Sequence, residues 1–92
     1  GQRDLEIVVE GHTDTDQVRS TSIPRDNWEL SVLRATAVVD ILLDDPGVDP
    51  AMLAASGRSQ YHPVDANNKA KNRRIEVILA PNLDSLYELI AE

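Results

Sequence analysis

Two charged residues stand out by their positions: Asp14 lies in a polar turn directly after an apolar strand, and Arg34 lies where an amphipathic helix should have an apolar residue. Asp14 ends the short turn GHTD, which directly follows an apolar strand. At about 100° per residue, Leu30, Ala37 and Ile41 fall within about 20° of one helical direction. Arg34 lies only about 40° from that direction, inside the apolar stripe. The sequence therefore turns a guanidinium toward the core side of a helix, or toward the rim of the core.

A guanidinium in that position needs a partner. Burying one is costly unless it is paired and hydrogen-bonded, and its planar fork of donors suits carboxylates. Asp14 is the best internal candidate, and a structural salt bridge from Arg34 to Asp14 would orient the turn. Alternatively, Arg34 keeps its fork for a ligand carboxylate while Asp14 accepts from a ligand ammonium. The pair would then be a receptor for a zwitterion such as an amino acid, and spacing leaves both interpretations open.

Other kinds of chemistry have weaker support. His12 and Asp14 are suitable metal ligands, but two ligands at i and i+2 with His62 as a remote third make a poor metal site. The chain has no cysteine, which removes zinc–thiolate sites, disulfides and thiol catalysis. No serine has a base and an orienting group beside it, and no glycine-rich phosphate loop is present. We therefore expect a binding protein with no cofactor, rather than an enzyme.

Size and charge narrow the class further. The chain has 92 residues, which allows one domain with one core, and its 16 acidic against nine basic residues give a formal charge of −7. Such a chain repels phosphate backbones, and its basic cluster over 69–74 is more typical of a solvated loop, so we expect no nucleic-acid binding. No segment reaches the roughly 18 apolar residues of a membrane span. We expect a soluble piece of a larger protein whose anchoring segment lies outside this sequence.

Periodicity predicts the elements that position these residues. Alternation predicts a strand over 5–10, and the pattern of Asp26 followed by Glu29 predicts the start of a helix that reaches about residue 43. A single helical turn is expected over 49–53, short strands over 54–57 and 73–79, and a closing amphipathic helix within 81–92. We expect Trp28 to pack locally in the first helical turn. The fold class predicted is an α/β (α+β) sandwich, with a βαββ-type mixed sheet and helices on one face.

Three spaced motifs resemble one family. "EGHTDTD", "NWELSVLRATAVVDILL" and "NRRIEVIL" occur in this order, and together they are similar to the OmpA-like C-terminal peptidoglycan-binding domain of the OmpA/MotB family. That family includes outer-membrane proteins, lipoproteins and the MotB stator subunits of flagellar motors. The resemblance covers residues 7 to 79 and implies that the domain occupies 1–80. It also implies a strand and a helix before the GHTD strand, which this sequence lacks, and a longer loop before Asn72.

The resemblance implies a ligand and a role for each site residue. Asp14 would take the ammonium and Arg34 the carboxylate of diaminopimelate in the peptidoglycan stem peptide, with Thr13 and Asn27 lining the pocket and Arg74 closing it. The expected function is non-catalytic anchoring of a cell-envelope protein to the cell wall, in the periplasm, with the parent protein anchored in a membrane. Alternatives are a flagellar-stator-type anchor and an interaction or oligomerisation module with a degenerate pocket. A homodimer is also left open.

Overall fold

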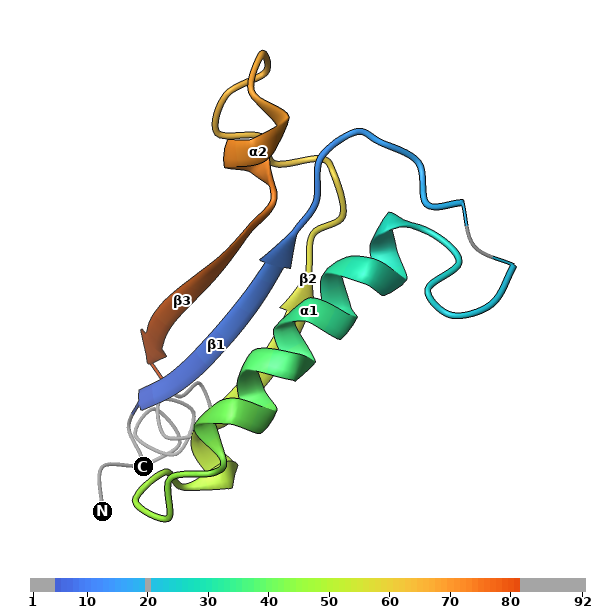
Figure 1. Cartoon of the computed structure of the whole chain (residues 1–92). Coiled ribbons are helices and arrows are strands. Elements are labelled where there is room, and N and C mark those ends of the chain that lie inside the picture. Colours follow the sequence, from blue (N-terminus) through green and yellow to red (C-terminus); the bar gives the residue numbers. More distant parts are fainter. Residues whose placement is uncertain (1–4, 20, 82–92) are drawn as a thin grey trace, which may run out of the picture.

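The computed structural model describes residues 5–19 and 21–81. This part of the chain contains three strands, one long helix, one short helix and one 3₁₀ turn, and Figure 1 shows how they are arranged. In chain order they are β1 (Leu5–His12), α1 (Asn27–Leu42), the 3₁₀ turn η1 (Pro50–Met52), β2 (Leu53–Gly57), α2 (Lys69–Asn72) and β3 (Arg74–Pro81).

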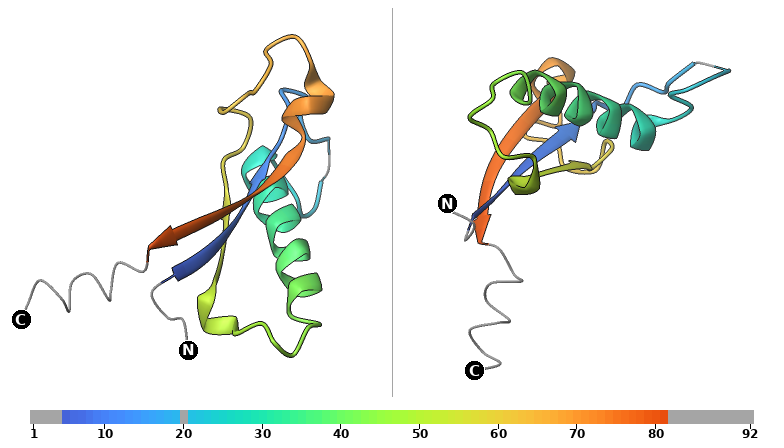
Figure 2. Two further views of the ribbon diagram at one scale, coloured as in Figure 1. Left: turned by 90° about the vertical axis from the view of Figure 1, so that its left-hand side faces the viewer. Right: turned by 90° about the horizontal axis from the view of Figure 1, so that it is seen from below.

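The strands form one mixed sheet in the order β2-β1-β3. The central strand β1 runs parallel to β2, with Val9 beside Ala55, and antiparallel to β3, with Glu10 beside Glu76. Helix α1 connects the two parallel strands and packs on β1 and β2 from one face of the sheet, which Figure 2 shows from two sides. The predicted fold class, a mixed βαββ-type sheet with its helix on one face, is confirmed.

Local sequence signals explain where α1 begins. Asp26 is the N-cap, and its side chain accepts a hydrogen bond of 2.9 Å from the backbone N–H of Glu29. This bond satisfies one of the N–H groups that a helix start leaves without a partner. The Glu29 carboxylate accepts from the backbone N–H of Arg25, one residue before the position that a capping box predicts. At the other end, the sequence 44–47 forms the turn that stops the helix.

The helix approaches the sheet closely because two glycines lie under it. A Cβ atom at Gly11 would come within 2.0 Å of the backbone oxygen of Ser31, and one at Gly57 within 2.3 Å of Ser31 Oγ. Ser31 and Ala35 are fully buried against these strands, together with Val9. The contact of α1 with β1 and β2 is therefore backbone against backbone over part of its length, and it places the first turns of α1 next to the end of β1.

Some expectations differ from the structure. Strand β1 continues through Gly11 to His12 instead of ending at the glycine, because Gly11 pairs with both Gly57 and Ile75. Helix α2 lies in a segment expected to be a loop. The expected closing helix lies outside the described residues, beyond Pro81. Among those described, no helix has the length and apolar character needed to cross a bilayer.

Trp28 was expected to pack locally in the first turn of α1, and the structure corrects this expectation in part. The side chain is 50% exposed, and its ring lies against the ring of Tyr61, which is 61% exposed. The helix contacts the sheet through Ser31 and Ala35, so Trp28 falls on the rim rather than in the core.

Candidate functional site

A cleft of about 320 Å³ lies where β1 ends beside the first turns of α1. It brings together Thr13 and Asp14 from the strand end with Asn27 and Arg34 from the helix. Four of the five residues predicted from the sequence therefore share one cleft. Arg73, from the segment before β3, also lines the cleft. Apolar side chains of the 14–27 loop and of α1 complete its wall: Val18, Pro24 and Leu30.

Asp14 is held in place by the backbone around it. The residue is only 6% exposed, and its Oδ1 atom accepts a hydrogen bond of 2.9 Å from the backbone N–H of Asp16. Its Oδ2 atom lies 3.3 Å from Nε of Arg73. The preceding residue, Thr13, donates its N–H to the carbonyl of Ser59 at 2.9 Å, and its hydroxyl donates to the carbonyl of Asp14. The carboxylate is thus buried, oriented and still able to accept another donor at Oδ2.

Arg34 is half-buried in the lining of the same cleft. Within 5–19 and 21–81 its guanidinium forms no ion pair and no hydrogen bond with another residue, and the cation that pairs with Asp14 is Arg73. The structural salt bridge from Arg34 to Asp14, one of the two interpretations of the sequence, is therefore not formed. The planar fork of Arg34 remains available for a carboxylate from outside the chain.

Asn27 ties the loop that follows Asp14 to the helix. Its Nδ2 atom donates to the carbonyls of Asp14 and Asp16, at 3.3 and 3.1 Å, and to Oε1 of Gln60 at 2.9 Å. Its Oδ1 atom is buried and has no hydrogen-bond partner in the described part of the chain. Asn27 thus fixes the shape of the cleft wall, while one of its polar atoms is left without a donor.

The two consecutive arginines of the NRR motif point to different places. Arg74 does not line the cleft: it pairs with Glu76 at 2.6 Å and donates to the carbonyl of His62 at 2.9 Å. Arg73 lies beside Asp14 and lines the cleft, whereas the family resemblance implied that Arg74 closes it. Successive side chains at a strand alternate between its two faces. Arg74 pairs with His12 across the strands and therefore shares its face, so the register of β3 on β1, which the sequence does not show, decides which arginine lines the cleft.

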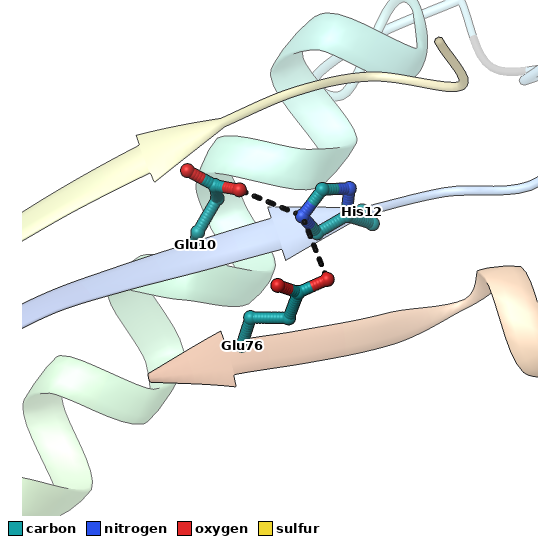
Figure 3. A group of neighbouring side chains, drawn as sticks. All are labelled: Glu10, His12 and Glu76. Carbon is teal, nitrogen blue, oxygen red and sulfur yellow. Dashed lines mark hydrogen bonds and ion pairs between the residues drawn. The ribbon is translucent and has the colours of Figure 1, made fainter. Parts of the chain in front are cut away.

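A partly buried ion-pair network lies outside this cleft, on neighbouring strands (Figure 3). Nε2 of His12 lies 2.9 Å from Oε1 of Glu10 and 3.6 Å from Oε2 of Glu76. Each carboxylate also has an arginine: Arg58 lies 3.1 Å from Glu10, and Arg74 pairs with Glu76. Burial raises the pKa of Glu10, but the hydrogen bonds from Arg58 and His12 outweigh it, so the pKa of this carboxyl is lower than usual.

These three side chains are close enough to be considered as metal ligands, but their surroundings suit an ion-pair network better. A histidine that binds a metal normally donates its other ring N–H to an acceptor. Nδ1 of His12 is buried and has no partner among the described residues. Two arginines already balance the charge of the two carboxylates, so a divalent cation would add uncompensated positive charge. The network links β1 to β3 and to the segment after β2.

The fold and the cleft together define a small α+β binding domain, with a charged cleft between a strand end and a helix. The sequence profile of the OmpA family matches residues 1–76, and the chain belongs to this family. This confirms the family suggested by the sequence motifs.

Individual relatives agree with this assignment. Motility protein B of Bacillus subtilis is 37% identical over 79 residues, which is 82% of this chain and 30% of that protein. Outer membrane porin F of Pseudomonas aeruginosa is 39% identical over 73 residues, 75% of this chain and 19% of the porin. The crystal structure of the periplasmic domain of Helicobacter pylori MotB superimposes with a TM-score of 0.77 at 26% identity, covering 97% of this chain and 56% of that one. The chain thus spans about a third or less of these curated relatives.

Proposed function

We propose that this domain binds peptidoglycan without catalysing a reaction, and that it recognises the diaminopimelate residue of the stem peptide. One observation carries the proposal: the Arg34 guanidinium lines the same cleft as the buried Asp14 carboxylate, yet has no partner in the described part of the chain. An unpaired cation beside an oriented anion is suited to a ligand that brings one charge of each sign. The amino-acid centre on the side chain of diaminopimelate is such a ligand.

Each residue has a defined role in this proposal. Asp14 accepts from the ligand ammonium through Oδ2, while the N–H of Asp16 holds Oδ1. Arg34 takes the ligand carboxylate in its planar fork. Thr13 and Asn27 keep the strand end and the following loop in position. We assign the closing of the cleft to Arg73, whose Nε already lies 3.3 Å from Asp14.

The burial of the cleft would strengthen the charged hydrogen bonds between the ligand and these residues. Charge-assisted hydrogen bonds gain strength when water is excluded, and truncating one partner of such a pair is costly because the other is left unpaired. Asp14 is nearly fully buried, and apolar side chains line the wall next to it. The net charge of −7 does not oppose recognition, because the contacts are local. The proposal needs no cofactor.

The whole protein would then be a cell-envelope protein anchored to the wall from the periplasm. The similarity to Bacillus subtilis Motility protein B and to the periplasmic domain of Helicobacter pylori MotB favours a stator-type anchor as the second candidate. The similarity to Pseudomonas aeruginosa porin F favours an outer-membrane protein. In both cases this domain would bind the cell wall, and another part of the parent protein would carry the membrane anchor.

Sedimentation with insoluble peptidoglycan tests the proposal. We expect Asp14→Asn and Arg34→Gln each to abolish co-sedimentation, because each removes one charge of the pair and keeps the shape of the side chain. Asp40→Asn and Arg19→Gln are matched controls on exposed residues, and we expect both to bind like the wild type. Circular dichroism establishes that all four variants are folded. Retained binding by both Asp14→Asn and Arg34→Gln would overturn the site.

A further inference from the structure

We propose that residues 82–92 pack as a helix on an exposed apolar surface of the sheet, beside α1. The surface consists of Ile75, Val77 and Leu79 of β3, and it is called the β3 surface below. This inference does not depend on the proposed ligand. It names an occupant for the part of the sheet that α1 leaves uncovered.

The β3 surface lies on the same side of the sheet as α1. Val77 pairs with Val9 of the neighbouring strand β1. Directly opposite residues on antiparallel strands share a face, and Val9 is fully buried on the face that α1 covers. Because side chains alternate along a strand, Ile75 and Leu79 point to the same side as Val77.

The side chains of the β3 surface are nevertheless open to solvent. The helix packs on β1 and β2, and β3 lies on the far side of β1 from β2 (Figure 1). Val77 is therefore 59% exposed and Leu79 67% exposed. Contiguous exposed apolar surface of this kind usually marks a place where another segment or molecule packs.

The adjoining side of α1 extends this apolar surface. A Cβ atom at Gly57 of β2 would come within 2.6 Å of Cγ2 of Val32, so Val32 lies on the β2 side of the helix. At about 100° per residue, Leu30, Ala37 and Ile41 lie about 140–180° around the helix from Val32. They are therefore on the side toward β3, where Ile41 is 69% exposed. A segment on the β3 surface would also contact this side of α1.

The chain itself supplies an occupant of suitable length and position. Strand β3 ends at Pro81, two positions after Leu79, so 82–92 begins at the edge of the β3 surface. As a helix, 82–92 would be about 16 Å long, and the β3 surface extends over about 13 Å at roughly 3.3 Å per residue. A tethered segment meets the surface at a high effective concentration, which favours it over a second copy of the chain.

The sequence of 82–92 predicts an amphipathic helix that needs such a surface. Its apolar residues recur at i, i+3, i+4 and i+7 and form one stripe, and its acidic residues fall outside that stripe. Asn82 is suited to cap the helix start. A helix this short is marginal alone in water and gains its stability by packing its apolar stripe. The stripe consists of Leu83, Leu86, Tyr87 and Ile90, and the acidic residues are Asp84, Glu88 and Glu92.

Disulfide trapping in the full chain tests this placement. The chain has no cysteine, so two introduced thiols react only with each other or with those of another copy. One variant combines Val77→Cys with Ile90→Cys, and its matched control combines Ile78→Cys with Ile90→Cys. Val77 and Ile78 are adjacent and exposed but point to opposite faces of β3. In a glutathione buffer we expect the Val77 pair to form an intramolecular disulfide about tenfold faster than the Ile78 pair.

Thermal unfolding gives a second measure that needs no oxidation. Leu86→Ser removes an apolar side chain from the proposed contact, so we expect it to lower the midpoint of unfolding by about 5 °C or more. Glu88→Ser is the matched control on the acidic side of the same segment, and we expect its midpoint to stay within about 3 °C of the wild type. Equal midpoints for the two variants would overturn the packing.

The trapping experiment also separates the other possible occupants. Equal rates for the two cysteine pairs would overturn the proposal and leave the β3 surface to a segment outside this sequence. Disulfide-linked dimers in place of the intramolecular bond would overturn it in favour of a second copy. Circular dichroism before oxidation establishes that both double variants are folded. Peptidoglycan sedimentation, which tests Asp14 and Arg34, is independent of these outcomes.

Discussion

The closest approach of α1 to the sheet, at Gly11, provides a direct test of how this domain holds its site. Replacing Gly11 with alanine adds a Cβ atom at 2.0 Å from the backbone oxygen of Ser31. Both sides of that contact are main chain, so no side chain can rotate away. Ordinary contacts of this kind begin near 3.4 Å, so the helix would have to retreat by about 1.4 Å.

The magnitude follows from that displacement. Overpacking of a well-packed interior typically costs about 1–3 kcal/mol and occasionally more, and here the added atom meets backbone. We expect Gly11→Ala to lower the free energy of unfolding by about 3 kcal/mol or more, a large part of the roughly 5–14 kcal/mol typical of a domain of this size. A retreating helix also moves Arg34 away from Asp14, so binding of a stem peptide should weaken as well.

Urea unfolding followed by circular dichroism measures this effect. The matched control is Gly47→Ala, whose Cβ would meet only the flexible carboxylate of Asp45, at 3.3 Å, and whose φ is not positive. We expect that control to stay within about 0.5 kcal/mol of the wild type. Equal unfolding midpoints for Gly11→Ala and Gly47→Ala would refute the account of how α1 meets β1.

Two further variants test other contacts. Ser31→Ala removes the acceptor of the Ser59 N–H and should lower the free energy of unfolding by about 1–3 kcal/mol, whereas Thr36→Ala, on the exposed face of α1, should change it by less than about 0.5 kcal/mol in urea unfolding. Arg58→Met should cost roughly 1 kcal/mol at pH 7, because it removes the guanidinium that holds the pKa of Glu10 low. A lowered pKa stabilises the fold above the ordinary glutamate range, near pH 4, and this stabilisation is lost as the pH falls through the folded-state pKa. In Arg58→Met the free energy of unfolding should therefore fall less steeply as the pH is lowered than it does in the wild type. Equal slopes of this free energy against pH in the two proteins would show that Arg58 does not lower the pKa of Glu10.

Helical periodicity singled out Arg34, the central residue of the proposed site, but it placed the buried face of α1 wrongly: Ser31 and Ala35 are buried, whereas Ile41 of the apolar stripe is 69% exposed. The stripe predicted that Arg34 needs a carboxylate partner, and Asp14 was the candidate at the end of the adjoining strand, but in the structure Asp14 pairs with Arg73. Side-chain capping also located the start of α1, because Asp26 and Glu29 are spaced for it. These predictions depend on local periodicity, which the sequence shows directly.

The remaining features depend on contacts between distant segments. Which of Arg73 and Arg74 faces the cleft is decided by the pairing of β3 with β1, and two consecutive arginines do not reveal that register. The exposure of Trp28 depends on the turn at Ser59, which brings Tyr61 beside it. A sequence pattern that identifies one helical face does not show which part of that face lies at the rim of a small core.

In the proposed function, Arg34 binds the side-chain carboxylate of a diaminopimelate whose ammonium is held by Asp14. Calorimetric titration with a diaminopimelate stem peptide and with its lysine counterpart tests this role of Arg34, because lysine keeps the ammonium and lacks the carboxylate. We predict that the diaminopimelate peptide binds about 10–100-fold more tightly, and that Arg34→Gln removes this preference. Equal affinity of the wild-type domain for the two peptides would show that Arg34 does not bind this carboxylate.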